Sequence, residues 1–376
     1  MSKFMFIVQG EGRGHLTQAL SLQQILTDAG HTVVAAAVGT KQGRVLPAFF
    51  TDKITCPIHT FRSPHLIYSP RTHALDVWRT VLTQVPQAYR YLQSAHQIQS
   101  LVHHYQPDVV INFYDVVGGL WRQFFERSIP MVCVGHQYLF LHQQFTFPPH
   151  SRLNKWLVNL NTRLTALRAT KLLALSFVYL AQDKHIAIVP PLLRQEVTCY
   201  VSKCVVQEKQ PFLLAYLTLP DLADDLIRWH QSHPNVIIHC FWNHPDHNTE
   251  LRFHNDGLIF HPIDGEQFLS YMRQCKGLIT TAGFESVCEA MYLGKPVMMI
   301  PVPKHFEQGC NAYDAAKAGA GMRATSFSEL EEFLHYLPFH HSIQANFQAW
   351  QQQSSCFFLR ELEMLSPTQS KLLSIG

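Results

Sequence analysis

Residues 4–30 read FMFIVQGEGRGHLTQALSLQQILTDAG, and this stretch decides the fold class. Phe4 to Gln9 is a short apolar run typical of a buried strand, and a glycine-rich turn follows it. From Leu16 to Leu26 apolar residues recur at helical spacing, and the run ends at Gly30. A second apolar run, Thr32 to Val38, comes next. Strand, glycine turn, helix and strand in this order predict a parallel β/α sheet.

Strands and helices continue to alternate along the chain, and the pattern starts again after the paired prolines at 190 and 191. Proline lacks a backbone N–H group and ends regular structure, so this pair marks a linker. Before it we expect a long helix at Leu82–Tyr105 and strands at Val109–Asn112 and Met131–Gly135. After it we expect strands at Phe212–Leu217, Val236–Phe241, Leu258–Phe260, Leu278–Thr280 and Val297–Pro301, and helices at Leu222–Trp229, Glu266–Arg273 and Ser286–Tyr292.

The predicted architecture is α/β, with two tandem Rossmann-like domains that each contain a doubly wound parallel sheet. We expect an amino-terminal domain at 1–188, a carboxyl-terminal domain at 189–340, and a helical tail at 341–376 that packs back across the cleft. Open α/β sheets bind ligands at the carboxyl ends of their strands. Two facing sheets would therefore hold both ligands in the cleft between them.

The composition fits a folded protein of this size. A chain of 376 residues, 47% hydrophobic and 15% charged, is long enough for two domains and is not intrinsically disordered. No apolar run approaches the roughly 18 residues of a membrane span, and the first residues lack a signal-peptide cleavage site. We therefore expect a cytoplasmic protein.

The net charge of +3 is unevenly distributed. Residues 1–188 carry 17 Lys and Arg against 8 Asp and Glu, and residues 189–376 carry 13 against 19. The basic half favours an anionic ligand or surface, although ordinary solvated charge explains the same counts. Lys and Arg are spread along the chain rather than clustered, which argues against nucleic-acid binding.

The glycine turn after the first strand has the spacing G-x-G-x-G-H at residues 10–15. A dinucleotide site needs G-x-G-x-x-G and a carboxylate after the second strand, and a Walker loop needs G-K-[ST]; both are missing. The turn still lets a ligand approach the backbone and a helix N-terminus, with His15 at the start of that helix. The alternative is a structural turn with an incidental histidine.

A second candidate site begins at the strand end Thr280. Gly283 permits close backbone approach, Ser286 is placed to cap the following helix, and Glu289 is placed to grip the vicinal hydroxyls of a ribose. After the next strand, Glu307 and Gln308 offer a carboxylate and an amide suited to sugar hydroxyls. The alternative is an ordinary helix start with acidic residues in its first turns.

Taken together, these motifs resemble those of the inverting glycosyltransferases with two Rossmann-like domains (GT-B type). That group includes the peptidoglycan-precursor N-acetylglucosaminyltransferase and the plant and macrolide UDP-sugar transferases. Residues 10–20 are similar to the loop G-G-T-G-G-H-x-x-P-A-L, residues 281–289 to H-C-G-W-N-S-x-x-E, and residues 307–312 to D/E-Q-x-x-N-A. The segment around Ile263 resembles the one that contacts the uracil edge. Thr281 and Glu285 depart from the family histidine and asparagine, and residues 216–220 lack the glycines found near the diphosphate.

The resemblance implies transfer of a sugar from a nucleotide diphosphate, with UDP expected, to an acceptor hydroxyl with inversion. The nucleotide-sugar is a co-substrate, and we expect neither a cofactor nor a metal; the pairs at His244/His247 and His340/His341 lack the spacing of metal ligands. His15 would be the base, and Asp115 stands nearest to the aspartate that orients the histidine in the plant enzymes. The predicted donor-binding residues are Gly12, Arg13, Gly14, Thr218, Ile263, Thr281, Ala282, Gly283, Ser286, Glu289, Glu307 and Gln308.

Two other functions fit the same motifs. A UDP-sugar 2-epimerase would use Glu289 for the ribose, and Glu285 or Glu307 for proton transfer. A non-catalytic subunit would bind the nucleotide-sugar and transfer nothing.

The acceptor is not identified by the sequence, and a lipid-linked acceptor is one alternative that the resemblance implies. The aromatic segments Tyr138–Leu141 and Phe145–Pro149 precede cations at Arg152, Lys155, Arg163 and Arg168, beside Trp156. An apolar lip with adjacent cations suits peripheral attachment to an anionic membrane. The other interpretation is that the aromatic residues pack inside the first domain.

Overall fold

The computed structural model describes residues 1–41, 44–65, 67, 76–149, 152–183, 185–199, 210–217, 221–242, 252–255 and 257–365. They form two compact units, each described here by itself. The first comprises the described residues within 1–67, 76–194 and 350–365, and the second comprises those within 195–349. The boundary follows Arg194, close to the predicted one at 188. The end of the predicted tail belongs to the first unit.

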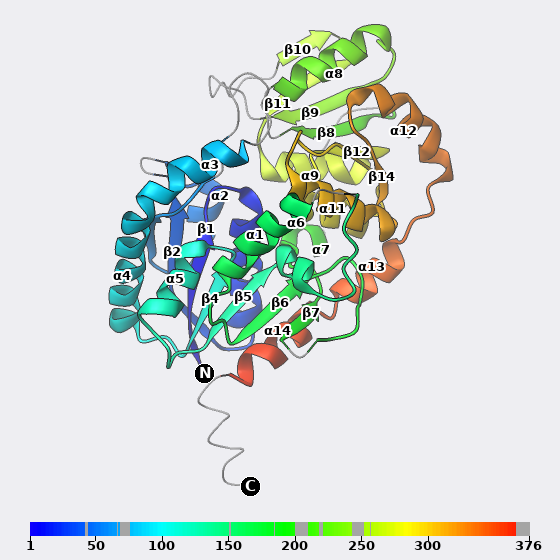
Figure 1. Ribbon diagram of the computed structural model, residues 1–376. Helices are drawn as coiled ribbons and strands as arrows, with labels where there is room; N and C mark the ends of the chain where they lie inside the picture. Colours follow the sequence, from blue (N-terminus) through cyan, green and yellow to red (C-terminus); the bar gives the residue numbers. More distant parts are fainter. Residues whose placement is uncertain are drawn as a thin grey trace. The chain divides into compact units, whose positions relative to one another are not determined.

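The first unit is built on a sheet of seven strands (Figure 1). Its strands are β1 (Lys3–Gln9), β2 (Thr32–Thr40), β3 (Ile58–Arg62), β4 (Val109–Phe113), β5 (Met131–Gly135), β6 (Lys171–Leu175) and β7 (Ile186–Val189). Its helices are α1 (Arg13–Asp28), α2 (Ala48–Thr51), α3 (Val77–Gln84), α4 (Ala88–Tyr105), α5 (Val116–Phe124), α6 (Arg152–Thr165) and α14 (Ser354–Glu363), with short 3-10 helices η1 (Val85–Gln87) and η2 (His136–Leu141).

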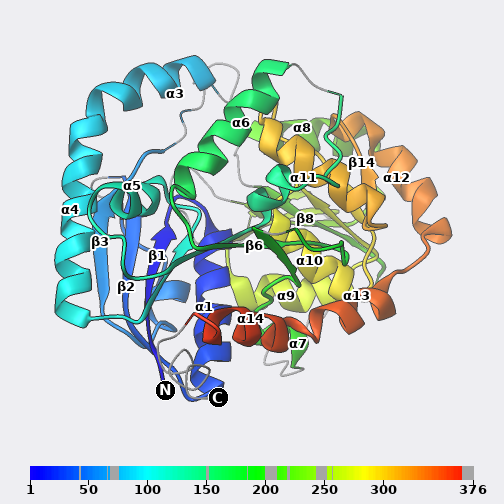
Figure 2. The same ribbon diagram turned by 60° about the horizontal axis from the view of Figure 1, so that its bottom comes forward.

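All strand pairs of this sheet are parallel, in the order β3-β2-β1-β4-β5-β6-β7. Helices α1 and α14 lie together on one face of the sheet, and α4 and α5 lie on the other (Figure 2). Coverage on both faces explains why the central strands are largely apolar. The strand order reverses between β1 and β4, so the loops that follow these two strands leave the sheet at its topological switch point, where open α/β sheets bind ligands.

The second unit repeats this plan. Its strands are β8 (Leu213–Leu217), β9 (Ile238–Trp242), β10 (Arg252–Asn255), β11 (Leu258–Pro262), β12 (Gly277–Thr280), β13 (Val297–Met299) and β14 (Gly321–Arg323). Its helices are α7 (Gln195–Thr198), α8 (Asp221–Ser232), α9 (Gly265–Gln274), α10 (Phe284–Tyr292), α11 (Phe306–Lys317) and α12 (Leu330–Tyr336), with η3 (Phe327–Glu329) and η4 (Leu337–Phe339). Helix α13 (Gln344–Gln351) carries the chain back to the first unit.

The sheet of the second unit runs β10-β11-β9-β8-β12-β13-β14, and all its strands are parallel except the edge strand β10. Leu213, Ala215 and Leu217 alternate along β8 and join a buried cluster with Leu226 of α8 and Phe333 of α12. The strand order reverses between β8 and β12, which puts the loop after β12 at the switch point.

The two predicted parallel sheets are confirmed, and two details differ from the sequence-based expectation. The helix expected at Leu82–Tyr105 is interrupted by η1, because Pro86 cannot donate the hydrogen bond that an α-helix requires there. Strands β3, β6, β7, β10 and β14 were not predicted, since they are short and carry no distinct periodicity. Among the described residues, none of the helices is long and apolar enough to cross a membrane.

Candidate functional site

The loop after β1 contains one tightly packed glycine, Gly10, and one with free space around it, Gly12. A Cβ atom on Gly10 would lie 2.7 Å from the carbonyl oxygen of Gly39 and 2.8 Å from Val38 Cγ1, so the neighbouring strand excludes any side chain there. Gly12 precedes the first turn of α1 as its cap residue, without a side-chain capping bond, and a Cβ atom on it would meet nothing within 4 Å. The start of α1 is therefore open to a ligand.

Two charged residues of this loop, Glu11 and Arg13, contact other residues of the first unit. Glu11 accepts hydrogen bonds from the backbone N–H of Lys41 and the guanidinium of Arg44, at 3.0 and 2.7 Å. The guanidinium of Arg13 lies 4.2 Å from the ring centroid of Phe49. Gly14 lies inside the first turn of α1.

His15 is half-buried on α1 and is oriented by two neighbours. Its Nδ1 lies 3.1 Å from Oε1 of Gln18, and its ring stacks on Tyr114, with centroids 5.7 Å apart. An amide oxygen only accepts hydrogen bonds, so Nδ1 carries the proton in this contact and Nε2 of the neutral ring keeps its lone pair. The ring can therefore accept a proton at Nε2.

The carboxylate of Asp115 is directed to other partners than His15. Oδ1 accepts a hydrogen bond from the N–H of Val117 at 2.8 Å, and Oδ2 accepts one from Ser63 Oγ at 2.8 Å. Asp115 is thus the N-cap of α5, and Gln18, not Asp115, occupies the orienting position at His15. Burial raises the pKa of Asp115 to about 6, while the bonds from Ser63, Val117 and Gly118 act in the opposite direction.

In the second unit, the chain makes a strained turn between β12 and α10. Ala282 has a φ of 60°, a left-handed conformation that is unusual for a residue with a Cβ atom, and Gly283 caps α10 without a side-chain capping bond. The prediction that Ser286 caps this helix is wrong. Ser286 lies within the first turn, and its Oγ donates back to the carbonyl of Gly283 at 3.2 Å and lies 3.2 Å from Thr280 Oγ1. Gly283 itself is exposed, and Thr281 is buried.

The remaining donor-site residues lie on α10, on α11 and ahead of α9. Glu289 is buried on α10, one turn beyond Ser286. Gln308 accepts the N–H of Val302 at its Oε1, at 2.8 Å, and its amide nitrogen makes no hydrogen bond within the described residues. Its neighbour Glu307 is half-buried in the first turn of α11, and Ile263 is half-buried before α9. Thr218 lies outside the described residues.

The start of α11 depends on His305, whose Nδ1 accepts the N–H of Gln308 at 3.4 Å. Burial lowers the pKa of His305 and so favours the neutral ring that this bond needs. His340 Nδ1 lies 2.7 Å from the hydroxyl of Tyr336, and His244 and His247 lie outside the described residues. Across the described chain, no three His, Cys, Asp or Glu side chains gather as metal ligands would.

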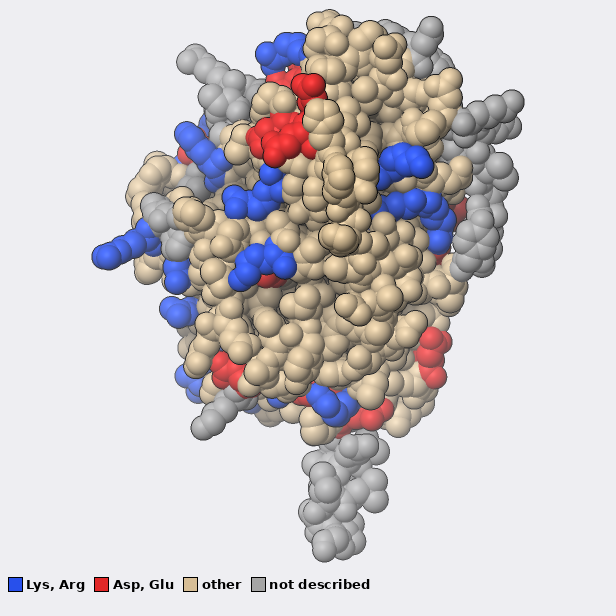
Figure 3. Space-filling view, turned by 90° about the vertical axis from the view of Figure 1, so that its right-hand side faces the viewer, with Lys and Arg blue, Asp and Glu red and all other residues tan. Residues whose placement is uncertain are grey.

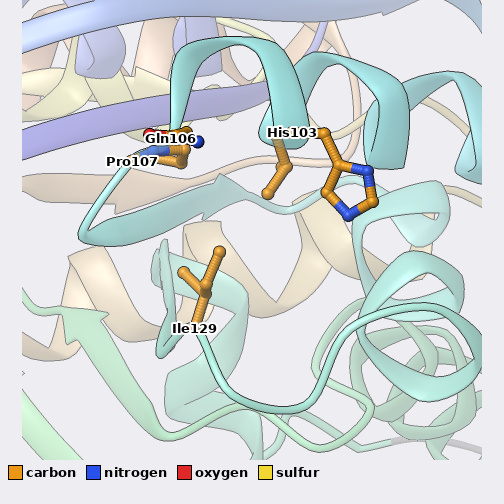
Figure 4. Close-up of a pocket in the computed structure, with 5 residues that line it drawn as sticks. His103, Gln106, Pro107 and Ile129 are labelled. Carbon is orange, nitrogen blue, oxygen red and sulfur yellow. The ribbon is translucent and has the colours of Figure 1, made fainter.

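A hollow in the first unit lies away from these loops. Val102, His103, Gln106, Pro107 and Ile129 line it, where α4 ends and the chain enters β4 and β5 (Figure 4). This is the amino-terminal edge of the sheet, opposite to the edge at which open α/β sheets bind ligands. We therefore do not assign the hollow to the functional site.

On one face of the molecule, the charges of the described residues do not mark a nucleic-acid site (Figure 3). On the face shown in Figure 3, the described Lys and Arg side chains stand in small separate groups, with acidic side chains and uncharged surface between them. A nucleic-acid site would gather them into a continuous stripe or patch.

Comparison with known proteins identifies the class. The sequence model of glycosyl transferase family 1 matches residues 2–338. The chain belongs to that family and is a glycosyltransferase of the GT-B type, an enzyme that transfers sugars. The expected membership of the GT-B glycosyltransferases is thereby confirmed. Among curated proteins, none matches the chain in sequence.

Solved structures agree with this fold. The glycotransferase of kitacinnamycin superposes with a TM-score of 0.66 at 15% identity, over 97% of this chain and 99% of its own. MurG of Acinetobacter baumannii superposes with a TM-score of 0.57 at 13% identity, over 97% of this chain and 100% of its own. The spinosyn rhamnosyltransferase SpnG, complexed with thymidine diphosphate, superposes with a TM-score of 0.57 at 14% identity, over 96% of this chain and 100% of its own. At such identities the likeness establishes the fold alone.

Sequence reasoning missed three residues of these sites. Gln18 lies one helical turn from His15, so the i, i+3 spacing was an available signal. Tyr114, with its φ of 60°, left no signal in the sequence. Asn311, whose side chain contacts the carbonyl of Ala282, is the asparagine of the D/E-Q-x-x-N-A element, but the motif did not indicate this contact because Ala282 is distant along the chain.

Proposed function

We propose that this glycosyltransferase transfers a sugar from a nucleoside diphosphate donor, UDP-linked in the first instance, to an acceptor hydroxyl with inversion at the anomeric carbon. In this proposal the second unit binds the donor and the first unit supplies the catalytic base. The observation that carries it is the open first turn of α10, capped by exposed Gly283 and followed by buried Glu289.

The donor side is supported by the groups that the second unit leaves available. A helix N-terminus without a side-chain cap offers backbone N–H groups and a positive dipole end to a diphosphate. Glu289 would hold the ribose hydroxyls. Gln308 would donate its amide hydrogens to the sugar, because its oxygen is already used by Val302. The solved structure of SpnG contains thymidine diphosphate, so that nucleotide belongs in the same test.

The base is His15. An acceptor hydroxyl has a pKa far above 7 and needs a positioned base as it attacks the anomeric carbon. The bond to Gln18 leaves Nε2 as the basic nitrogen of His15. The leaving diphosphate gains negative charge in the same step, and the N–H groups at the start of α10 would stabilise it electrostatically.

A panel of nucleoside diphosphates and their sugars in thermal-shift measurements tests the donor. A ligand that binds the native state raises its melting temperature, so UDP or thymidine diphosphate should raise it more than adenosine or guanosine diphosphate. No shift with any of them would contradict the proposal. Incubating UDP-N-acetylglucosamine with the enzyme and no acceptor separates the 2-epimerase alternative, since only an epimerase would convert it.

For the acceptor side we propose peripheral attachment to an anionic membrane, with a lipid-linked acceptor. Of the two interpretations of the aromatic segments, packing inside the first unit is confirmed for Tyr138 and Leu139, which are fully buried, and for Phe140 and Phe145, which are nearly so. These side chains do not form an apolar surface for a membrane. Helix α6 instead exposes Leu153, Trp156 (57%) and Leu160, and α3 exposes Trp78 (68%) and Leu82. Neither helix contains an Asp or Glu residue; the nearest acidic residue is Asp76, which accepts the N–H of Arg79 at the start of α3. The side chains of the helices themselves therefore do not repel anionic lipid.

Co-sedimentation with vesicles tests this attachment. The protein should bind vesicles that contain phosphatidylglycerol, not phosphatidylcholine alone, and salt should weaken the binding. Trp156→Ser and Trp78→Ser should reduce it, whereas Phe339→Ser, which removes an exposed aromatic ring of the second unit, should not. Absence of binding at low salt would favour a soluble acceptor.

A further inference from the structure

The turn between β12 and α10 holds an alanine where glycine would be unstrained. Ala282 is fully buried and has a φ of 60°, a region in which the Cβ atom crowds the backbone. Such a conformation persists only where the surroundings fix it, and it relaxes when they are removed. Some contact must therefore hold this turn in place.

That contact comes from α11. Nδ2 of Asn311 donates a hydrogen bond to the carbonyl oxygen of Ala282 at 3.3 Å, and the Asn311 side chain is buried. Its Oδ1 is buried too, and within the described residues it has no hydrogen-bond partner. An unsatisfied buried oxygen is unfavourable, so Asn311 is a poor residue for packing alone.

The bond also fixes the peptide that joins Ala282 to Gly283. In a planar trans peptide the C=O and N–H groups point in opposite directions. Turning the carbonyl of Ala282 toward Asn311 therefore turns the N–H of Gly283 away from it. This N–H precedes the first turn of α10 and has no hydrogen-bond partner within the part of the chain that the structure describes.

We propose that Asn311 is a positioning residue of the donor site: by holding the carbonyl of Ala282, it keeps the left-handed turn that aims the N–H of Gly283 at the donor diphosphate. The inference rests on the proposed function, because it takes the start of α10 as the diphosphate site. Asn311 itself does not touch the donor. It acts through the turn, one helical turn along α11 from Gln308.

The test combines removal of the amide with relief of the strain. Asn311→Ala should weaken UDP binding in calorimetry about tenfold, the loss expected for one hydrogen bond. Its melting temperature should fall only slightly, because the carbonyl of Ala282 loses its donor while the unsatisfied oxygen of Asn311 leaves with the amide. Asn311→Asp should bind UDP more weakly still, since a carboxylate repels the carbonyl. Adding Ala282→Gly to Asn311→Ala should restore UDP affinity toward the wild type, because glycine accepts a φ of 60° without strain.

Hydrogen exchange gives a readout that needs no ligand. In the unliganded protein, the amides of residues 283–286 should exchange faster in Asn311→Ala, and slower again in the double variant. As a control, Asn112→Ala removes a buried amide that donates to Thr165 and Asp115 in the first unit, and should leave both readouts unchanged.

Two results would overturn the role of Asn311: unchanged exchange and UDP affinity in Asn311→Ala, or a loss of affinity that Ala282→Gly does not recover. If the wild type binds no nucleotide while exchange changes as expected, the proposed function fails and the coupling between Asn311 and the turn stands.

Discussion

The buried carboxyl of Asp115 predicts a specific pH dependence of stability in the first unit. Its pKa rises from 3.8 to about 6 on folding, because burial disfavours the charged form. Between these two values the folded protein holds a proton that the unfolded chain has released. The free energy of unfolding therefore falls as the pH rises through this window, and the stabilisation is fully present only below the lower value. Integrated from pH 4.5 to 7.5, the decrease in the free energy of unfolding is about 2 kcal/mol.

Asp115→Asn removes this titration with little change in shape. The amide oxygen can still accept the N–H of Val117, and the amide nitrogen can donate to Ser63 Oγ. We expect the difference in stability between pH 4.5 and 7.5 to change by about 2 kcal/mol relative to the wild type, with the variant gaining at pH 7.5. Hydrogen exchange of peptides from β4 and α5, corrected for intrinsic rates, measures this in the first unit alone.

Ser63→Ala should increase the pH dependence of the stability, in contrast to Asp115→Asn. The hydroxyl of Ser63 lowers the pKa of Asp115, so its loss should raise that pKa further and increase the destabilisation at pH 7.5. A wild-type pH dependence in Asp115→Asn, or a weaker one in Ser63→Ala, would refute the reasoning that burial of this carboxyl controls the stability.

Three further predictions concern catalysis and donor binding. Glu289→Ala should weaken UDP binding by about 1.5–3 kcal/mol, the range for hydrogen bonds to a charged group; unchanged affinity in calorimetry would remove Glu289 from the site. His15→Ala should lower turnover about a hundredfold or more with donor affinity nearly unchanged, and Gln18→Leu should lower it less; full turnover in His15→Ala would exclude it as the base. Gln308→Ala should weaken binding of the UDP-sugar more than that of UDP, and equal losses by calorimetry would show that Gln308 does not contact the sugar.

Much of the site could be predicted from the sequence because its elements are local. The glycine turn before α1 and the run from Thr280 to Glu289 each place their residues within one strand–loop–helix unit. Strand ends and helix starts are set by neighbouring residues, so a motif spanning them has a predictable backbone. The hydrogen bond between His15 and Gln18 is also a local contact, since the two residues lie one turn apart on α1.

The sequence by itself determined the two parallel sheets, because apolar runs and helical spacing are read from adjacent residues. Only the tertiary structure decided which side chains meet. Ser63 reaches Asp115 because β3 and β4 belong to one sheet, and Asn311 reaches Ala282 because α10 and α11 follow neighbouring strands. The tertiary structure likewise decided that Tyr138 is buried and that Trp156 is exposed. Contacts between distant segments depend on strand order and helix packing, which periodicity along the chain does not specify.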